Sequence, residues 1–574
     1  MNAPPRVRIS GALLRALLPV VLVSCAGQAP PPGGPEDRIP PEIISTSPAP
    51  YSTYYSERVV ALEFSEYVER RSVEGAIFVS PDVGRLEFDW SGQEVEITFA
   101  DSLKPNTTYV VTVGTDVVDL RNRNRMARAF SIAFSTGGQI DRAAIAGIVY
   151  PESGGASKSG VLVGAYRLDD LDPDTLNPRW TKPDYVTQTG SAGEFALPHL
   201  RFGRYRLLAL RDEYTNLLYD PQTDAYGLLA GDVALSEADT LVRDLAIAMA
   251  VEDTTAPTLI KATARSLQQV ELQFSEPLRE SDIPVKGVEA RDTLSGASLE
   301  VLAVSMKRPE RDRYLLASAQ QDSMAVYRLT VLGVRDSAGN DISPIANSLT
   351  FQPNTSSDTV GFRLVGFSTR DSSRSVARRP ILEAYFSRPA DRSIPPRSVV
   401  LSDTLGRALP LDVSWSGSLT LSVQPRRPLS HEAWYRLTIL EGMLSDVFGS
   451  RGRDTTIAIA FQVVSADRLG SIEGTAIDES TSDSRGPIVV FAQPVDGSRG
   501  GTIRQTIDGP GPFVLSEVPE GQYRIGGYRD RNGNALYDAG AVFPYTPAER
   551  FRLVADTLRV RARWPYEGAV LRLR

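Results

Sequence analysis

Three copies of one short pattern decide the fold of this chain. They read Val60-Ala-Leu-Glu-Phe-Ser-Glu66, Val270-Glu-Leu-Gln-Phe-Ser-Glu276 and Leu382-Glu-Ala-Tyr-Phe-Ser-Arg388. In each copy, every second residue up to the phenylalanine is apolar. Successive side chains of a strand point to opposite faces of a sheet, so this alternation predicts a β-strand with one buried face.

A second strand recurs later in each copy around a tyrosine, and an acidic turn follows it. The tyrosines and the acidic residues are Tyr109 with Asp119, Tyr327 with Asp336, and Tyr435 with Asp446. The first two copies also open on similar segments, Asp37-Arg-Ile-Pro-Pro41 and Asp253-Thr-Thr-Ala-Pro257. Short alternating strands separated by turn signals are typical of β-sandwiches.

These segments resemble the bacterial Ig-like domain of surface-layer and cell-envelope proteins. The proline openings, the Phe-Ser-Glu strand and the tyrosine strand carry the resemblance, which covers 38–138, 253–353 and 360–464. The third copy lacks the proline opening and has Arg388 where the others have glutamate. The resemblance implies a sandwich fold and implies almost nothing about a ligand.

A different repeat occupies two other parts of the chain. It follows the starter strands Ile145-Ala-Gly147 and Ile472-Glu-Gly474, and it runs from Gly193 to Asp212 and from Gly511 to Asp530. A strand, a short glycine turn and a strand around a tyrosine predict a hairpin-rich unit. The two segments resemble the carboxypeptidase-regulatory or transthyretin-like sandwich over 141–250 and 468–574. In that family the domain is an accessory module.

The predicted fold class is therefore all-β, with tandem Ig-like and transthyretin-like sandwiches. The chain has 574 residues, which suits several domains. Each predicted sandwich has about 100 residues, enough to build its own core. A signal peptide at 1–24 and a Pro/Gly-rich tether at 25–37 are expected to precede them.

The N-terminus predicts an anchored protein. Arg6, Arg8 and Arg15 precede an apolar run from Ala16 to Val23, as in a signal peptide. This run is too short to span a bilayer, which needs about 20 residues. Leu22-Val-Ser-Cys25 resembles the bacterial lipobox, in which the cysteine receives a diacylglycerol and becomes the new N-terminus. The alternative is an ordinary secretory signal that contains the chain's one cysteine.

Lipidation of Cys25 would make the membrane a partner through an anchor of two or three acyl chains, which hold far better than one. The segment Ala26–Pro35 reads as a stiff, extended tether. Ala26 resembles the sorting signal that enteric bacteria use for the outer membrane, whereas other phyla use other rules. The expected location is thus the cell envelope, at the outer membrane.

A polar loop in the last repeat is a candidate calcium site. Asp530, Asn532, Asn534 and Asp538, with the carbonyl of Leu536, have the 1-3-5-7-9 spacing that resembles the start of an EF-hand loop. Glycine stands at position 4 instead of 6, and no glutamate occupies position 12. Any bound ion is expected to stiffen the loop, and no other cofactor is expected.

The earlier repeat has a poorer version of the same loop. Asp212, Asn216 and Asp220 match three of the four side chains, but Tyr214 stands where the last repeat has Asn532. The alternative for both copies is a long hairpin turn that hydrogen-bonds to itself. In that case Tyr219 and Tyr537 would pin the turn to the sandwich.

The sequence contains few groups suited to catalysis. His199 and His431 belong to no His-Glu-x-x-His motif, and no Gly-x-Ser-x-Gly elbow is present. The net charge of −8, without a cluster of Lys and Arg, argues against nucleic-acid binding. A non-enzymatic protein is therefore predicted. A deep pocket with converging titratable groups would instead favour an enzyme.

The function that fits these features is a cell-envelope lipoprotein acting as a multi-domain structural or interaction arm. The alternative is a binding module for surface polysaccharide or a partner protein. Tyr51, Tyr54 and Tyr55 could stack on sugars, or they could pack against the neighbouring domain.

Overall fold

The structure is a computed structural model that describes residues 37–152, 158–169, 172–356, 360–479, 485–495 and 501–574. The predicted signal peptide, Cys25 and the tether from Ala26 to Pro35 lie outside the described residues. In the part of the chain that the structure describes, no helix is long and apolar enough to cross a membrane.

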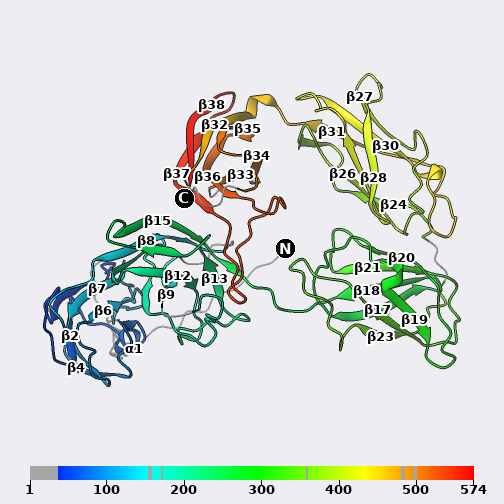
Figure 1. The fold of residues 1–574 in the computed structure, drawn as a ribbon. Coiled ribbons are helices and arrows are strands. Elements are labelled where there is room, and N and C mark those ends of the chain that lie inside the picture. Colours follow the sequence, from blue (N-terminus) through cyan, green and yellow to red (C-terminus); the bar gives the residue numbers. More distant parts are fainter. Residues whose placement is uncertain (1–36, 153–157, 170–171, 357–359, 480–484, 496–500) are drawn as a thin grey trace, which may run out of the picture.

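The chain is built almost entirely of β-strands arranged as a series of two-layered sandwiches (Figure 1). The prediction of an all-β chain of tandem sandwiches is confirmed. The helical segments among the described residues are short: α1 (Arg70–Glu74), η1 (Val285–Gly287), η2 (Glu441–Met443) and η3 (Ala466–Arg468). We number the sandwiches first to fifth in chain order. The domain limits given above stay predictions.

The first, third and fourth sandwiches share one topology. In the first, a sheet of order β1-β2-β5-β4 packs on a sheet of order β3-β6-β7. Its strands are β1 (Ile43–Ser47), β2 (Val59–Phe64), β3 (Ile77–Ser80), β4 (Leu86–Ser91), β5 (Glu94–Phe99), β6 (Thr108–Val113) and β7 (Phe130–Ser135).

The third sandwich repeats this arrangement with the orders β17-β18-β21-β20 and β19-β22-β23. Its strands are β17 (Leu259–Ser266), β18 (Gln269–Phe274), β19 (Val288–Asp292), β20 (Val301–Met306), β21 (Arg313–Ser318), β22 (Tyr327–Val331) and β23 (Ser348–Phe351).

The fourth sandwich has the same two sheets, with one strand added beside β31, although its sequence lacks the proline opening. The orders are β24-β26-β29-β28 and β25-β31-β30-β27. Its strands are β24 (Leu364–Phe367), β25 (Ser373–Val376), β26 (Leu382–Phe386), β27 (Val399–Asp403), β28 (Leu411–Gly417), β29 (Thr420–Pro425), β30 (Trp434–Leu440) and β31 (Thr456–Val463).

The repeated sequence pattern forms the core of each of these sandwiches. The alternating strands are β2, β18 and β26, and their apolar residues are buried. The recurrent tyrosines lie on β6, β22 and β30 in the opposite sheet. The hydroxyl of Tyr109 accepts the backbone N–H of Lys104 (2.7 Å), and Tyr327 and Tyr435 do the same at equivalent places. The tyrosine therefore fills the core and also closes the turn before its own strand.

The second and fifth sandwiches share another topology. In the second, the orders are β11-β8-β15 and β10-β9-β12-β13-β16, with β14 also paired to β12. Its strands are β8 (Ala143–Tyr150), β9 (Leu162–Arg167), β10 (Tyr185–Gln188), β11 (Glu194–Leu200), β12 (Gly203–Leu210), β13 (Ala225–Leu228), β14 (Val233–Leu235), β15 (Leu241–Ala248) and β16 (Ala250–Val251).

In the fifth sandwich the orders are β35-β32-β38 and β34-β33-β36-β37. Its strands are β32 (Leu469–Asp478), β33 (Ile488–Pro494), β34 (Ile503–Ile507), β35 (Gly511–Pro519), β36 (Gly521–Arg529), β37 (Phe551–Val560) and β38 (Pro565–Leu573). In both sandwiches the starter strand is central and pairs parallel with the last strand of its sheet.

The glycine of each starter strand is explained by that parallel neighbour. A Cβ atom at Gly147 would lie 2.5 Å from the carbonyl oxygen of Leu245, and one at Gly474 would lie 2.2 Å from that of Ala569. The register shifts at both places, so the neighbouring strand comes too close for any side chain.

The chain does not stay extended but returns on itself. Figure 1 shows it passing from the second sandwich through the third and fourth to the fifth, whose long loop between β36 and β37 reaches back toward β13. The hydroxyl of Tyr226 on β13 donates to the carbonyl oxygen of Gly540 in that loop (2.7 Å). The predicted arm is thus closed by a contact between its two related sandwiches.

Candidate functional site

The loop after β36 is organised by a buried carboxylate. Asp530 accepts the backbone N–H groups of Gly533 (2.7 Å), Asn534 (3.1 Å) and Ala535 (2.8 Å). An aspartate that accepts hydrogen bonds from the residues following it folds the chain into a tight turn. Asp530 therefore shapes the loop from the end of its strand.

The structure brings together the four side chains predicted to bind calcium. The amides of Asn532 and Asn534 donate to the carboxylate of Asp538, at 2.6 and 3.2 Å. The side-chain oxygen of Asn534 accepts the N–H of Leu536 (2.7 Å). This is the geometry of the self-bonded turn, whereas a calcium ion would draw on the same oxygens as ligands. The calcium site stays a prediction.

The matching loop of the second sandwich is built in a similar way. Asp212 accepts the N–H groups of Asn216 (3.2 Å) and Leu217 (2.7 Å), and the side-chain oxygen of Asn216 accepts that of Leu218 (2.7 Å). The third predicted ligand, Asp220, donates its own N–H to Asp224 (2.9 Å). The predicted weaker calcium site at this loop is likewise untested.

Both loops are held at a second point by buried carboxyl groups that the sequence reading missed. Asp224 accepts the N–H groups of Glu213 and Asp220, and Glu549 accepts those of Arg531 and Asp538. Burial raises the pKa of both carboxyl groups. The sequence offered little signal, because the two loops differ in length and one carboxyl is aspartate and the other glutamate.

Calcium binding to the loop of the fifth sandwich has a direct calorimetric test. If Asp530 and Asp538 are ligands, titration of Ca²⁺ into the protein gives a binding heat that Asp538→Ala removes, because calcium requires six to eight oxygens. Equal heats for the two proteins would leave the loop as a hydrogen-bonded turn. Asp412→Ala removes an exposed carboxylate elsewhere and serves as the control.

The loop of the fifth sandwich docks on the second sandwich through apolar side chains. Val542 and Ala548 are buried in a cluster formed mostly by residues of the second sandwich, among them Tyr226. The guanidinium carbon of Arg206 lies 3.4 Å from the centre of the Tyr545 ring. The contact therefore combines apolar burial with a cation–π interaction. We call this contact the closing junction.

Polar contacts extend the closing junction along β15 and β37. The hydroxyl of Tyr150 donates to the carbonyl oxygen of Leu553 (2.7 Å). Arg552 donates to the carbonyl oxygen of Asp244 (2.6 Å), and Arg574 pairs with the carboxylate of Asp244 (2.5 Å). Residues of β8 and β15 thus contact β37 and the C-terminal Arg574, and they extend the contact made by the loop.

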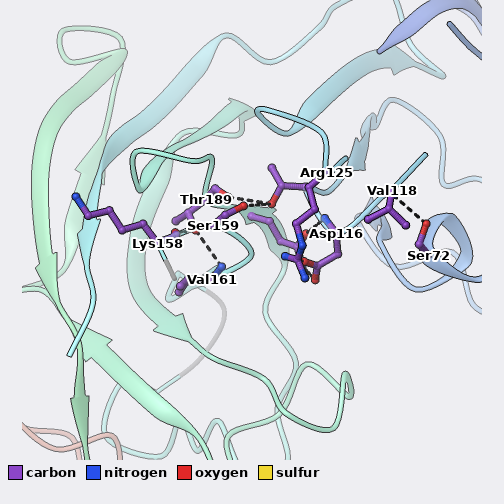
Figure 2. Close-up of polar contacts among 10 residues, drawn as sticks. Ser72, Asp116, Val118, Arg125, Lys158, Ser159, Val161 and Thr189 are labelled. Carbon is purple, nitrogen blue, oxygen red and sulfur yellow. Dashed lines mark hydrogen bonds and ion pairs between the residues drawn. The ribbon is translucent and has the colours of Figure 1, made fainter. Parts of the chain in front are cut away.

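The first and second sandwiches meet through buried polar groups, which Figure 2 shows. Thr189 donates its hydroxyl to the carbonyl oxygen of Lys158 (2.6 Å) and accepts the N–H of Val161 (2.9 Å). Its own carbonyl accepts the hydroxyl of Thr115 from the first sandwich (2.9 Å). Close by, Asp116 pairs with Arg125 (2.6 Å). The bond from Thr115 to Thr189 crosses between the two sandwiches, whereas the other contacts hold the groups on each side of it in place.

The third and fourth sandwiches are joined at Asp282. Its carboxylate accepts the backbone N–H (3.0 Å) and the hydroxyl (2.8 Å) of Ser418 and also pairs with Arg392. An ion pair between Arg378 and Glu517 (3.0 Å) links the fourth sandwich to the fifth.

The three tyrosines considered for sugar stacking have different environments. Tyr51 and Tyr54 are exposed, whereas Tyr55 packs against Phe134 of the first core, with ring centres 4.9 Å apart. Tyr55 is therefore mainly a packing residue. The ring of Tyr51 meets the ring of His199 of the second sandwich edge-on, with ring centres 5.4 Å apart, as expected for packing against the neighbouring domain. Tyr51 and His199 line an open groove of about 750 Å³.

The two histidines make backbone contacts. Nδ1 of His199 hydrogen-bonds to the carbonyl oxygen of Asp141 (3.2 Å), and Nδ1 of His431 to that of Val464 (2.9 Å). Each histidine thus has a structural partner at the edge of its sandwich.

The acidic residues that recur in the Ig-like segments converge in the structure. Carboxylate oxygens of Asp253, Glu276 and Asp336 lie within 4.8 Å of one another, close enough to share one cation. The first sandwich has Asp37, Glu66 and Asp119 at the equivalent places, and burial, then repulsion by the two aspartates, raises the pKa of Glu66.

The fourth sandwich has an arginine at the position where the first and third have a glutamate that is repelled by neighbouring carboxylates. Arg388 stands where the other copies have glutamate, and it pairs with the buried carboxylate of Asp446 at 3.2 Å. In the sequence, this substitution indicates only a weaker match to the other copies. In the structure it replaces a repulsive contact with an attractive one.

Glu276→Arg is expected to stabilise the third sandwich at neutral pH by up to about 1 kcal/mol, the usual range for partly exposed charge pairs. Burial and repulsion by Asp253 and Asp336 raise the pKa of Glu276 above 4.5. The native state therefore holds this proton more tightly than the unfolded state, and stability is lost as pH rises through the native pKa. The variant should lack that loss.

Thermal unfolding from about pH 4.5 to neutrality measures this effect. A chelator is present, so that only the repulsion is recorded. The matched control is Glu289→Arg, which changes an exposed glutamate on β19. The same pH profile for the wild type and Glu276→Arg would show that repulsion among Asp253, Glu276 and Asp336 does not lower the stability of the third sandwich.

Comparison with known proteins identifies one family model. Residues 37–136, which hold the first sandwich, match the model described as bacterial Ig-like domain. A search of curated protein sequences gives no match.

Several solved structures are similar to the chain at low identity. One is the N-terminal part of the bacterial S-layer protein SbsC, with 8% identity, a TM-score of 0.16 and coverage of 36% of this chain and 44% of that chain. SbsC domains 1–6 match at 9% identity and a TM-score of 0.15, over 91% and 68%. BcpA, the major pilin subunit of Bacillus cereus, matches at 10% identity and a TM-score of 0.14, over 76% and 99%. Identities and TM-scores this low support no inference about function.

Proposed function

We propose that this protein is a non-enzymatic lipoprotein of the cell envelope whose sandwiches form a structural and interaction frame. The closing junction is the observation that carries the proposal. A chain of independent modules would need no contact between its second and fifth members, yet here a long loop is devoted to it. A closed frame holds its surface loops at fixed separations, which suits a scaffold.

Further features support a rigid frame. The first two sandwiches share buried hydrogen bonds, and the third and fourth share the Asp282 network. Domains of one chain move relative to each other by default unless their interface is extensive. The match of residues 37–136 to a bacterial Ig-like model supports a β-sandwich repeat protein of bacterial type. The proposed partners are the membrane, through Cys25, and an envelope protein.

A second candidate function is the binding of surface polysaccharide at the groove between the first two sandwiches. Tyr51, His199 and Phe202 line this groove together with Asp141 and Arg142. Aromatic faces beside polar groups suit the apolar and hydroxyl faces of sugars. Glycan arrays probed with the protein and with Tyr51→Ala test it, and the absence of saturable binding to any sugar would eliminate it.

The proposed anchor at Cys25 is tested by mass spectrometry of the protein extracted from membranes. We expect a chain that begins at Cys25 and carries a diacylglycerol, because a lipidated cysteine holds the protein at the membrane through several acyl chains. Cys25→Ala should lack that added mass. An unprocessed N-terminus, or Cys25 without lipid in the wild type, would contradict the proposed location at the outer membrane.

A further inference from the structure

Four arginines line a pocket at the closing junction. The pocket has a volume of about 330 Å³, which is at the small end of ligand sites. One wall is the turn between β13 and β14 of the second sandwich. The other is formed by Arg529, Arg531, Arg550 and Arg574 of the fifth sandwich.

The charge of the pocket lining is positive. The carboxylate that also lines it, Asp232, is committed to Arg206 through two hydrogen bonds of 2.9 and 3.2 Å. Asp478 pairs with Arg550, and Glu479 pairs with Arg574. These carboxylates fix the orientation of the guanidinium groups. Arginines held in this way are suited to bind an oxyanion without further ordering.

Arg529 supplies the observation that points to a ligand. Its side chain is about 95% buried, since its exposed fraction is 5%, and its Nε donates to the carbonyl oxygen of Arg485 (3.1 Å). Its Nη1 lies 3.6 Å from the carboxylate of Asp478, too far for a hydrogen bond, and has no hydrogen-bond acceptor among the described residues. A buried donor without an acceptor is costly, and native structures contain few of them.

We propose that this pocket binds an oxyanion, namely the phosphate or carboxylate group of a small molecule. An oxygen of the ligand would accept the hydrogen bond that Arg529 Nη1 lacks, and Arg531, Arg550 and Arg574 would present further donors to it. The assignment goes beyond the structural frame, because it gives the closing junction a ligand. Since both sandwiches line the pocket, the bound anion would also favour the closed state by mass action.

Isothermal titration of the full-length protein in detergent tests the assignment. Two probes, inorganic phosphate and glucuronate, distinguish a phosphate group from a carboxylate group. We expect saturable binding of at least one, weakened about tenfold or more by Arg529→Gln, because hydrogen bonds to charged groups contribute on this scale. Arg436→Gln, which changes an exposed arginine of the fourth sandwich, should bind like the wild type.

Arg574→Gln provides a second variant, because the side chain of Arg574 is 41% exposed and its loss should leave the fifth core folded. Circular dichroism checks the fold of each variant. Binding of neither probe, or equal binding by the wild type and by folded Arg529→Gln and Arg574→Gln, would overturn the assignment. Unchanged binding after the closing junction is opened would overturn it as well. None of these outcomes bears on the lipid at Cys25.

Discussion

Val542→Asp is expected to separate the fifth sandwich from the second and to lower the sedimentation coefficient of the chain. Val542 is only 2% exposed, and its neighbours belong to the closing junction and not to the core of the fifth sandwich. Burying an unpaired carboxylate costs several kcal/mol, and undocking allows the introduced carboxylate to stay in water. The sandwiches should undock while each stays folded.

The control is Val514→Asp, which introduces the same charge at a valine of β35 that is 47% exposed. Sedimentation velocity compares the two variants, and calorimetry shows whether the fifth sandwich still unfolds cooperatively. If Val542→Asp sedimented like Val514→Asp, the closing junction would not hold the chain together.

Asp478→Ala is expected to destabilise the fifth sandwich by about 3–5 kcal/mol, the cost of leaving buried charges without their partner. The side chain of Asp478 is 3% exposed, at the end of β32. It accepts a hydrogen bond from Arg550 Nη2 at 2.9 Å and lies 3.6 Å from Arg529. Its removal would leave the guanidinium groups of Arg529 and Arg550 buried without this carboxylate. Urea unfolding followed by circular dichroism measures the loss.

An exposed ion pair offers the matched comparison. Asp412 and Arg426 are more than 60% exposed and lie at a comparable distance, 2.8 Å. Asp412→Ala should change the free energy of unfolding by less than about 1 kcal/mol. Equal losses for Asp478→Ala and Asp412→Ala would mean that burial does not set the strength of these pairs.

The sandwiches could be predicted because their signal is local and repeated. The alternation from Val60 to Phe64 places every second side chain on one face, and those side chains are buried in β2. The same holds for β18 and β26. Even the third copy, which lacks the proline opening, forms the same sheets, because the opening lies outside the strands that build the core.

The closing junction could not be predicted, because it joins distant parts of the chain. Tyr226 and Gly540 are 314 residues apart, and Val542 and Ala548 lie in a loop without periodicity. An isolated apolar residue in a polar loop carries no pattern that identifies its partner. Glu549 was missed for a related reason, since a buried carboxyl group has no sequence signature.

In the loop from Asp530 to Asp538, the spacing of polar residues indicates a curved chain but does not identify what their oxygens bind. Both interpretations of this loop require a tightly curved chain, and its polar side chains lie close together in the structure. Spacing could not distinguish a cation from backbone N–H groups, since an aspartate oxygen accepts either.

Small-angle X-ray scattering of residues 37–574 tests the closed frame most directly. A closed frame gives a pair-distance distribution that matches the described structure, with the fifth sandwich against the second. Five sandwiches in a line would instead reach a maximum dimension of roughly 170 Å, given a radius of gyration of about 13 Å for a 100-residue domain. A curve of that extended kind for the unmodified chain would show that the closing junction does not form in solution.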